Sequence, residues 1–409
     1  MSKTENQKKR KALMLTSVFT NLGLLGIFKY FNFFIDSFAS TFTLLGQEIS
    51  VDRLEIVLPV GISFYTFQTL SYSIDLYNRK MEAYKDPVGF FAFVSFFPQL
   101  VAGPIERAKD LLPQFNDLKV FNYDEVRRGL IQMAWGFLKK VVIADRLAIF
   151  INSTYGDPAA AEGLPMIMGV IFFAFQLYLD FSAYSDIAIG CARTLGFKLS
   201  LNFNRPYLAS SFSNFWTRWH ITLSTWFRDY LYIPLGGNRN NKTTRNILIV
   251  FMVSGLWHGA SWNFVIWGAI NGLFLIVLDP ILAKLGKNIL SKVIIVVIVF
   301  TSWSMSLIFF RAQTFDNAIA VFKNLGFNNA GSLYEHGLVK AEYSFAIYAI
   351  IILLIIELIQ QTNLNVFERF FNLPLPFRWL TYTCWILVIL FLGSYGLNVD
   401  DASFIYFQF

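Results

Sequence analysis

Apolar residues gather in runs that approach the length of a membrane-spanning helix. A helix rises about 1.5 Å per residue, so roughly 20 apolar residues cross a hydrocarbon core about 30 Å thick. Six runs reach or approach this length, at 12–35, 163–187, 245–279, 292–310, 342–360 and 379–397. Three further stretches contain glycine, proline or charge and are candidates for spans, broken helices or re-entrant segments, at 54–76, 87–104 and 128–151. The pattern predicts an all-α polytopic membrane protein with about eight to ten membrane elements.

The composition supports a lipid environment. Of the 409 residues, 55% are hydrophobic and 15% are charged, and the mean hydropathy is +0.49. These values are too apolar and too charge-poor for an ordinary soluble domain. No linker rich in proline, glycine or serine divides the chain, so we expect a single membrane domain over 1–409. The loop at 312–341 is assigned neither a side nor a role.

The distribution of charge predicts an orientation. The formal net charge of +7 does not indicate nucleic-acid binding, because lysine and arginine collect in the cytoplasmic loops of membrane proteins. The clearest basic clusters are the run at 8–11 and the group Arg239, Lys242 and Arg245, and both are predicted to face the cytoplasm. The apolar stretch after Leu13 is too long for a signal peptide and lacks a nearby cleavage site, so we expect a retained anchor.

Several common chemistries lack their sequence signatures. Cys191 and Cys384 lie far apart, in or beside apolar stretches, so neither a disulfide framework nor a thiolate metal site is supported. The chain contains no P-loop, no GxGxxG after a strand and no HExxH. ATP-driven, nicotinamide-dependent and zinc-hydrolase activities are therefore disfavoured.

The segment 202–237 mixes aromatic and charged residues, which is typical of a membrane interface. We expect short amphipathic or partly buried helices here instead of a simple span. The residues concerned are Tyr207, Trp216, Trp219, Trp226, Tyr230 and Tyr232 with Arg205, Arg218, Arg228 and Asp229.

His258 is an ionisable residue deep within an apolar run. If its helix starts near Arg245 at the cytoplasmic face, a rise of about 1.5 Å per residue places it roughly 20 Å into the bilayer, past the midplane. A neutral imidazole there can take a proton from a hydroxyl and return it, as acyl transfer from a thioester to an alcohol requires. Alternatively, His258 hydrogen-bonds a neighbouring helix while Gly255 and Gly259, a GxxxG pair, allow close packing. Both interpretations stay open, although intramembrane ionisable groups default to function.

His220 lies four residues after Trp216 and four before Ser224, so on a helix the three would share a face. It could position a substrate, but the residues alone favour a structural role as a polar tip at an aromatic interface.

Asp180 and Asp186 stand at or near the end of a long apolar run, where carboxylates need partners. The simplest expectation is ion pairing with arginine or lysine from 205–245. Orientation of a catalytic histidine is the alternative.

The turn Gly236-Gly237, followed by Asn238 and Arg239, could offer backbone amides and a guanidinium to a phosphate at the cytoplasmic surface. A two-glycine turn is weak evidence by itself.

Four segments in the middle of the chain carry a resemblance to a known family. They are 202–207 (NFNRPY), 215–226 (FWTRWHITLSTW), 228–239 (RDYLYIPLGGNR) and 254–260 (SGLWHGA). The chain resembles the membrane-bound O-acyltransferase superfamily in its alginate O-acetylation branch, and 254–260 matches the family's hallmark histidine motif. Further similarity lies at 58–64, 96–105 and 404–409, so the resemblance covers most of the chain.

The resemblance implies a helical scaffold around a central tunnel, with re-entrant and interfacial helices. It implies that an acetyl group from a cytoplasmic donor, expected to be acetyl-CoA, crosses this tunnel to a polysaccharide acceptor such as alginate. No bound cofactor or metal is expected. His258 would be the catalytic residue and His220 the second family histidine near the acyl path. The remaining candidate substrate-binding residues are Trp219, Trp257, Arg218, Asp180, Asp186, Asn238 and Arg239.

The resemblance also implies a setting. We expect a multi-pass protein of the bacterial inner membrane, surrounded by lipid and working with an extracytoplasmic partner of the SGNH-hydrolase type. Two departures stand out, since the chain is shorter at its start than relatives, and Asn271-Gly272 replaces a second His-Gly. The alternatives are D-alanyl transfer to teichoic acid and a non-catalytic glycan export scaffold that would tolerate loss of His258.

Overall fold

The computed structural model describes residues 1–409 apart from 2–3, 48, 240, 287, 327–330, 363–365, 396–403 and 405–409. The described residues form helices and loops without a strand, which confirms the all-α prediction. Six of their helices are long and apolar enough to span a membrane: Gln7–Leu44, Leu164–Thr194, Trp262–Leu282, Ile289–Arg311, Lys340–Gln361 and Leu375–Leu392. Each corresponds to one of the six predicted runs, so the multi-pass architecture is confirmed.

The first of these helices is continuous but irregular. It consists of α1 (Gln7–Leu25), a π-helical segment η1 (Gly26–Tyr30) and α2 (Phe31–Leu44). Most of its surface is exposed, whereas η1 packs against the chain interior through the buried Tyr30 and the partly buried Lys29. Lys29 lies in the middle of this apolar helix, and its side chain is directed toward the interior of the molecule.

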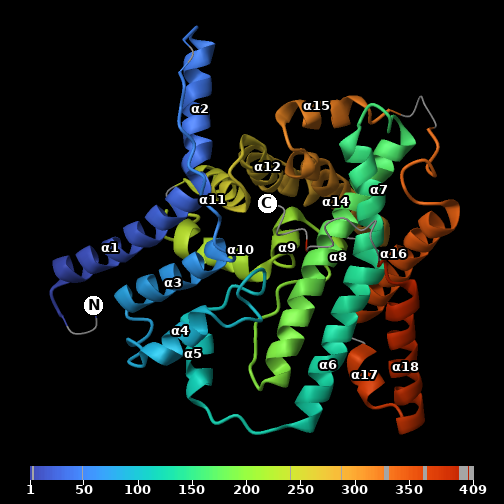
Figure 1. The fold of residues 1–409 in the computed structure, drawn as a ribbon, viewed down its shortest axis with the longest axis horizontal. Coiled ribbons are helices and arrows are strands. Elements are labelled where there is room, and N and C mark those ends of the chain that lie inside the picture. Colours follow the sequence, from blue (N-terminus) through green and yellow to red (C-terminus); the bar gives the residue numbers. More distant parts are fainter. Residues whose placement is uncertain are drawn as a thin grey trace.

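The centre of the molecule is built around α8 (Leu164–Thr194), most of which is buried. Beside it runs a second long helix, made of α6 (Tyr123–Phe137), the π-helical η2 (Leu138–Ala144) and α7 (Asp145–Gly156) (Figure 1). The predicted stretch 128–151 is therefore part of a single helix. Its π-helical segment buries both Lys139 and Lys140, although a lysine is costly to bury unless it is paired.

The other two uncertain stretches are only partly helical. Within 54–76, α3 begins at Ile62 and extends to Tyr77, and within 87–104 the short α4 covers Pro87–Val94. Turns fill 95–103, and α5 (Ala108–Asn116) follows. The segment 202–237 contains the predicted short helices: η3 (Pro206–Leu208), α9 (Phe212–Trp216), α10 (Ile221–Phe227) and η4 (Arg228–Tyr232).

The apolar run 245–279 is not one helix but a hairpin. The first arm is α11 (Thr243–His258), and the second arm joins α12 (Trp262–Leu273), η5 (Phe274–Leu278) and α13 (Asp279–Leu282). Glycines let the arms meet, because a Cβ on Gly255 would lie 2.1 Å from the carbonyl oxygen of Phe264. The packing interpretation of Gly255 is thus correct, with the close contact made inside the hairpin.

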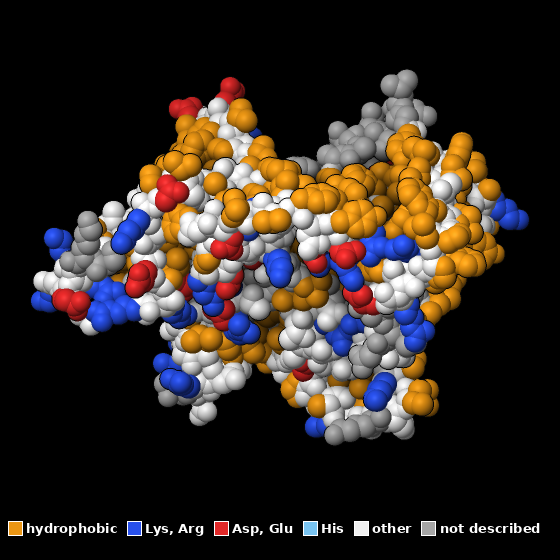
Figure 2. Space-filling view, turned by 90° about the horizontal axis from the view of Figure 1, so that it is seen from below, with side chains coloured by type: hydrophobic (Ala, Val, Ile, Leu, Met, Phe, Trp, Pro, Cys, Tyr) orange, Lys and Arg blue, Asp and Glu red, His pale blue; other side chains and the backbone are white. Residues whose placement is uncertain are grey.

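The remaining helices complete the wall of the molecule. They are α14 (Ile289–Arg311), α15 (Phe315–Lys323), α16 (Lys340–Gln361), α17 (Val366–Phe371) and α18 (Leu375–Leu392). In Figure 1, α5, α17 and the start of α6 lie at the lower end, whereas α15 and the tip of α2 lie at the upper end. Seen from below, lysine and arginine side chains are spread across the molecule (Figure 2).

Candidate active site

His258 is the last residue of α11 and lies at the tip of the hairpin. Its side chain is buried, and its ring centroid is 5.1 Å from that of Trp257, 5.2 Å from Trp267 and 5.3 Å from Phe310. Three aromatic rings therefore hold the imidazole in a fixed place. The turn that follows positions α12, because the Ser261 side chain accepts from the Asn263 amide as an N-cap.

A lysine from a distant helix fixes the end of α11. Lys29 Nζ donates to the carbonyl oxygens of Trp257 at 2.7 Å and His258 at 3.1 Å, and to Ser63 Oγ at 3.2 Å. The last carbonyls of a helix have no intrahelical partner, and a cation there also complements the helix dipole. The Lys29 ammonium thus caps the helix that carries His258.

His220 does not lie on a helix with Trp216 and Ser224, so that prediction was wrong. It lies after α9, at the N-cap position of α10, with a positive φ of 42°. Its Nδ1 is 3.1 Å from Asn202 Oδ1, which can only accept, so Nδ1 carries the proton and donates. Nε2 is then an unprotonated acceptor, and it has no hydrogen-bond partner among the described residues.

The structure brings the two predicted histidines to one place. The Trp257 ring lies between them, with centroids 6.2 Å from His220 and 5.1 Å from His258. Trp219 belongs to the same aromatic cluster through Trp303, at 4.9 Å. Both tryptophans that were predicted to bind substrate therefore lie in the immediate surroundings of the histidines.

The cluster contains buried donors that sequence reasoning missed. The indole Nε1 groups of Trp216 and Trp267 are buried and have no acceptor within the described part of the chain. Buried N–H groups normally have a hydrogen-bond acceptor, so those without one favour binding of a ligand that supplies an acceptor. Trp267 is 5.9 Å from Trp303 and 5.2 Å from His258. A carbonyl oxygen bound here would find donors close to an imidazole base.

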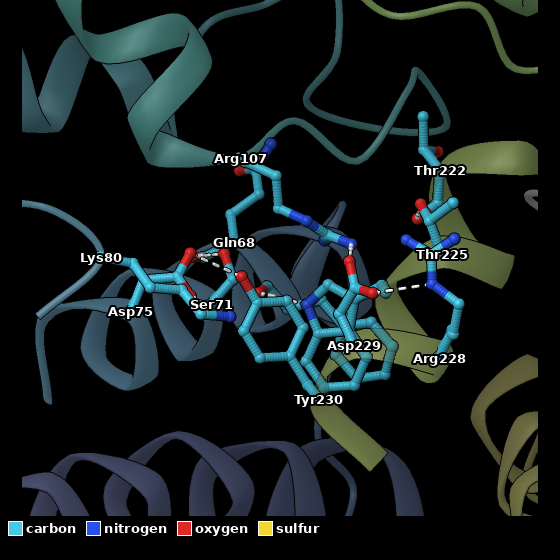
Figure 3. A network of polar contacts seen from close by, with 12 residues as sticks. Gln68, Ser71, Asp75, Lys80, Arg107, Thr222, Thr225, Arg228, Asp229 and Tyr230 are labelled. Carbon is cyan, nitrogen blue, oxygen red and sulfur yellow. Dashed lines mark hydrogen bonds and ion pairs between the residues drawn. The ribbon is translucent and has the colours of Figure 1, made fainter. Parts of the chain in front are cut away.

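A second polar network lies beside this cluster, between α3, the segment before α5, and η4 (Figure 3). Tyr230 donates its hydroxyl to Asp75 at 2.6 Å, and the Arg107 guanidinium lies over the Tyr230 ring at 4.9 Å. Asp229 joins Arg107 at 3.8 Å and Arg228 at 2.8 Å. The Asp229 carboxylate thus lies between the two guanidinium groups of Arg107 and Arg228.

Two groups in this network have unmet hydrogen-bonding capacity. Gln68 is buried, and neither its side-chain oxygen nor its nitrogen has a partner within the described residues. The Arg107 Nη1 atom is likewise buried without an acceptor there. Burying a polar group unsatisfied costs about 1–3 kcal/mol, so both groups mark a place where a polar ligand would bind.

Aromatic rings connect this network to His258 without a break. Tyr230 contacts Trp226 at 5.1 Å, Trp226 stacks on Phe67 at 3.8 Å, and Phe67 lies 5.3 Å from Trp257. Trp257 in turn contacts His258. These rings form a continuous aromatic wall between the charged network and the histidines, and sequence spacing gave no sign of it.

Asp180 and Asp186 were expected to pair with the region 205–245, and that prediction was wrong. Lys139 Nζ is 2.6 Å from Asp186, and Lys140 Nζ is 2.6 Å from Asp180 and 2.7 Å from Asp145. The wider turns of η2 direct two consecutive lysines toward α8. These ion pairs join the two central helices, and buried charge requires such pairing.

The other candidate binding residues lie away from the histidine rings. The Arg218 side chain donates to Asn214 Oδ1 at 3.0 Å and to Gln361 Oε1 at 3.2 Å. Asn238 accepts from the Tyr232 hydroxyl, and Arg239 is exposed.

The glycine turn does not offer its amides to a ligand, contrary to the prediction. The Gly236 amide donates to Ile233 and the Gly237 amide donates to Tyr232, at 3.0 and 2.9 Å. The turn closes the end of η4, and the backbone N–H groups are used for that closure.

Comparison with known proteins agrees with these features. The membrane-bound O-acyltransferase family matches residues 44–310. A probable alginate O-acetylase from Azotobacter vinelandii is 46% identical over 63% of this chain and 52% of its own length. A peptidoglycan O-acetyltransferase from Helicobacter pylori is 36% identical over 81% of the chain and 67% of its own length.

A more distant relative is a teichoic acid D-alanyltransferase from Streptococcus thermophilus, 31% identical over 55% of this chain and 58% of its own length. The chain spans about half the length of the alginate O-acetylases that it matches. The match at 44–310 contains both histidines, the hairpin and the two central helices. The chain belongs to the membrane-bound O-acyltransferase family.

Proposed function

We propose that this protein passes an acetyl group from a cytoplasmic thioester across the membrane to an acceptor hydroxyl, for O-acetylation of a polysaccharide outside the cytoplasm. The observation that carries the proposal is the meeting of His220 and His258 around Trp257 in a buried aromatic cluster. The relatives named as alginate and peptidoglycan O-acetylating enzymes support the acetyl group and the glycan acceptor. The D-alanyltransferase is less similar, so acetyl transfer is preferred over D-alanyl transfer.

His258 acts as the general base in this proposal. The acceptor hydroxyl loses its proton to the imidazole as its oxygen attacks the thioester carbonyl carbon. The C–S bond then breaks, and the proton passes to the departing thiolate. The indole N–H group of Trp267 supports this step, because a donor near the carbonyl oxygen stabilises the charge that develops there.

The acyl donor is proposed to be acetyl-CoA, which would approach through the network of Figure 3. Arg107 and Arg228 provide guanidinium groups for phosphates, and the Gln68 amide can bond an amide of the pantetheine arm. In this proposal the thioester moves along the aromatic wall from Tyr230 to Trp257 until it reaches His258. A narrow path suits this chemistry, since the acetyl unit is small and neutral whereas CoA is large and charged.

We further propose that the protein resides in the bacterial inner membrane with its basic lower face toward the cytoplasm. The acetyl group would leave on the opposite side, where a partner of the SGNH-hydrolase type completes transfer to the glycan.

The general-base assignment is tested by measuring the O-acetyl content of secreted and wall polysaccharides in cells that carry His258→Gln or His258→Ala. We expect a loss of about 10²-fold or more, which is the usual contribution of a positioned base. His336→Gln is the matched control, because His336 is also buried and aromatic-packed but contacts Ser153 and Phe150 instead. Membrane levels of all variants must match, and full acetylation with His258→Gln would exclude the proposed base.

The donor site is tested with initial rates in inverted membrane vesicles against acetyl-CoA concentration. Arg107→Gln should raise the KM for acetyl-CoA about tenfold to hundredfold, because a charge-assisted bond to phosphate is lost, with a smaller change in kcat. Arg239→Gln, an exposed basic residue outside the network, should leave KM near the wild-type value. If Arg239→Gln raised the KM and Arg107→Gln did not, the donor would instead bind near the glycine turn.

A further inference from the structure

A polar pocket separates α16 from the central helix pair. It has a volume of about 610 Å³ and lies between α6 and α8 on one side and α16 on the other, with residues 201–205 and α17 also lining it. The pocket does not include either site histidine. It adjoins the site through Asn202, whose Oδ1 accepts from His220, and through Phe203, whose ring stacks 6.4 Å from that of His220.

Most charges that line the pocket are already neutralised by neighbours. Lys139 pairs with Asp186 at 2.6 Å, Arg128 binds both carboxylate oxygens of Glu368, and Arg193 pairs with Glu125 at 3.2 Å. Two charged lining residues remain outside such pairs, namely Glu357 and Arg205. They carry opposite charges.

Glu357 is a buried carboxylate that is only half satisfied. The side chain is 5% exposed, and one oxygen accepts from the Tyr178 hydroxyl. The other oxygen, Oε2, is buried and has no partner in the described part of the chain. Leaving a charged oxygen in this state is costly, so a donor from a ligand in the pocket would be strongly favoured.

Arg205 is held in place by strained backbone. Its φ is 50°, in the left-handed region that a non-glycine residue rarely adopts. The guanidinium bonds the side chain of its own neighbour Asn204 at 2.8 and 3.0 Å, and no described carboxylate lies within ion-pair distance. Arg218 donates to the carbonyl oxygens of both residues at 3.5 Å. Such strain is typical of ligand clamps.

The position of the pocket selects a lipid headgroup over a soluble ligand. Glu357 lies in the last two turns of α16 and Arg193 in the last turn of α8, so the pocket begins near the ends of two spanning helices and reaches inward to Tyr178 in the middle of α8. The apolar side chains of Leu353, Ile356 and Ile189 line it as well. On α16 the neighbouring residues 351, 352 and 355 are exposed and apolar, as expected of a lipid-facing surface.

We propose that this pocket binds the headgroup of phosphatidylethanolamine. The primary ammonium donates to Glu357 Oε2, and the phosphate is bound by the Arg205 guanidinium. A zwitterionic headgroup carries one positive and one negative group, so it can neutralise both the Glu357 carboxylate and the Arg205 guanidinium. A choline headgroup carries no N–H and cannot satisfy Glu357, and a glycerol headgroup lacks the positive charge.

The test uses the purified full-length protein in detergent, titrated with short-chain phosphatidylethanolamine, phosphatidylcholine and phosphatidylglycerol while its melting temperature is followed. Wild type should bind the ethanolamine lipid tightest. Glu357→Gln should weaken the binding of phosphatidylethanolamine about tenfold to hundredfold and leave the binding of phosphatidylglycerol unchanged, because only the ammonium contact is lost. Arg205→Gln should weaken the binding of both lipids, and Arg239→Gln should change the binding of neither.

A second measurement covers variants that fold poorly. The lipids retained by each variant after extraction from membranes containing all three classes are quantified by mass spectrometry per mole of folded protein. Equal retention of the three lipids by wild type, or an unchanged ethanolamine preference in Glu357→Gln, would overturn the proposal. Displacement of the lipid by acetyl-CoA would also overturn it and assign the pocket to the acyl donor. The proposal does not depend on acyl transfer, so loss of lipid binding leaves the proposed function untouched.

Discussion

At the scale of single residues, Asn202 determines the chemical state of His220. Three donors converge on its Oδ1: His220 Nδ1 at 3.1 Å, the Thr222 amide at 3.3 Å and the Thr222 hydroxyl at 2.9 Å. The Thr222 amide can only donate, which fixes the end of the Asn202 side chain that faces it as oxygen, and Nδ2 then donates to Ser185 Oγ at 3.2 Å. One buried asparagine thereby keeps the proton on Nδ1 of the imidazole and leaves Nε2 free to accept.

Asn202→Ala should lower acetyl transfer by about tenfold or more, because an imidazole without its orienting partner can adopt the wrong tautomer. Asn202→Asp keeps acceptor oxygens for His220 and Thr222 and should recover part of the rate. Acetyl transfer per mole of folded protein separates this effect from instability. Equal rates for the alanine and aspartate variants would show that the hydrogen bond to His220 does not matter for transfer.

The sequence pointed to the histidines but not to the residues that hold them. His258 and His220 could be selected because polar groups are rare in apolar surroundings. Lys29 contacts His258 across 229 positions of the chain, and no local pattern carries such a pairing. The same limit explains the wrong partners given to Asp180 and Asp186, since only the π-helical turn in η2 reveals that Lys139 and Lys140 both face α8.

At the scale of elements, the hairpin of α11 and α12 decides where His258 stands. Both arms are apolar, so the hydropathy of 245–279 shows one continuous run and conceals the reversal. The signals for the turn are local: Gly259 is extended with a φ of −160°, and Ser261 caps α12. The apolar run predicted helical structure here, whereas the tip required attention to these two residues.

Gly255→Ala should displace the hairpin tip. The added Cβ would meet the Phe264 carbonyl oxygen at 2.1 Å, and a backbone atom cannot move aside without separating the arms. We expect a destabilisation of about 1–3 kcal/mol and loss of acetyl transfer because His258 shifts.

Gly272→Ala is the matched control in the same hairpin. Its nearest neighbours are at 3.3 Å, the Leu248 side chain and the Phe251 Cβ, and can adjust. Thermal unfolding and acetylation should both stay near wild type. If the two substitutions behave alike, close contact at Gly255 is not what positions the histidine.

At the scale of the whole molecule, the basic residues are distributed unequally between the two ends of the helices. The connections at the upper end of Figure 1 are 45–61, 157–163 and 312–339, and in sequence their basic residues are Arg53 and Lys323. The segments at the lower end are the connection 117–122, the start of α6 and the connection after α8, and in sequence their basic residues include Lys119, Arg127, Arg128 and Lys198. The sequence alone left the side of 312–341 open, because that loop has little charge. The fold places α15 at the same end as the tip of α2, so the two share one side of the membrane.

This arrangement predicts which loops an external reagent reaches. Lysine and arginine are retained on the cytoplasmic side, so the upper end should face outward. In a variant with Cys191 and Cys384 replaced by serine, cysteines are introduced singly at the exposed positions Lys119 and Lys323. A membrane-impermeant maleimide added to intact spheroplasts should label Lys323→Cys and spare Lys119→Cys until the membrane is opened. Labelling in the opposite order would mean that the protein has the reverse orientation in the membrane. The donor network would then face the outside, which would contradict the proposed direction of acetyl transfer.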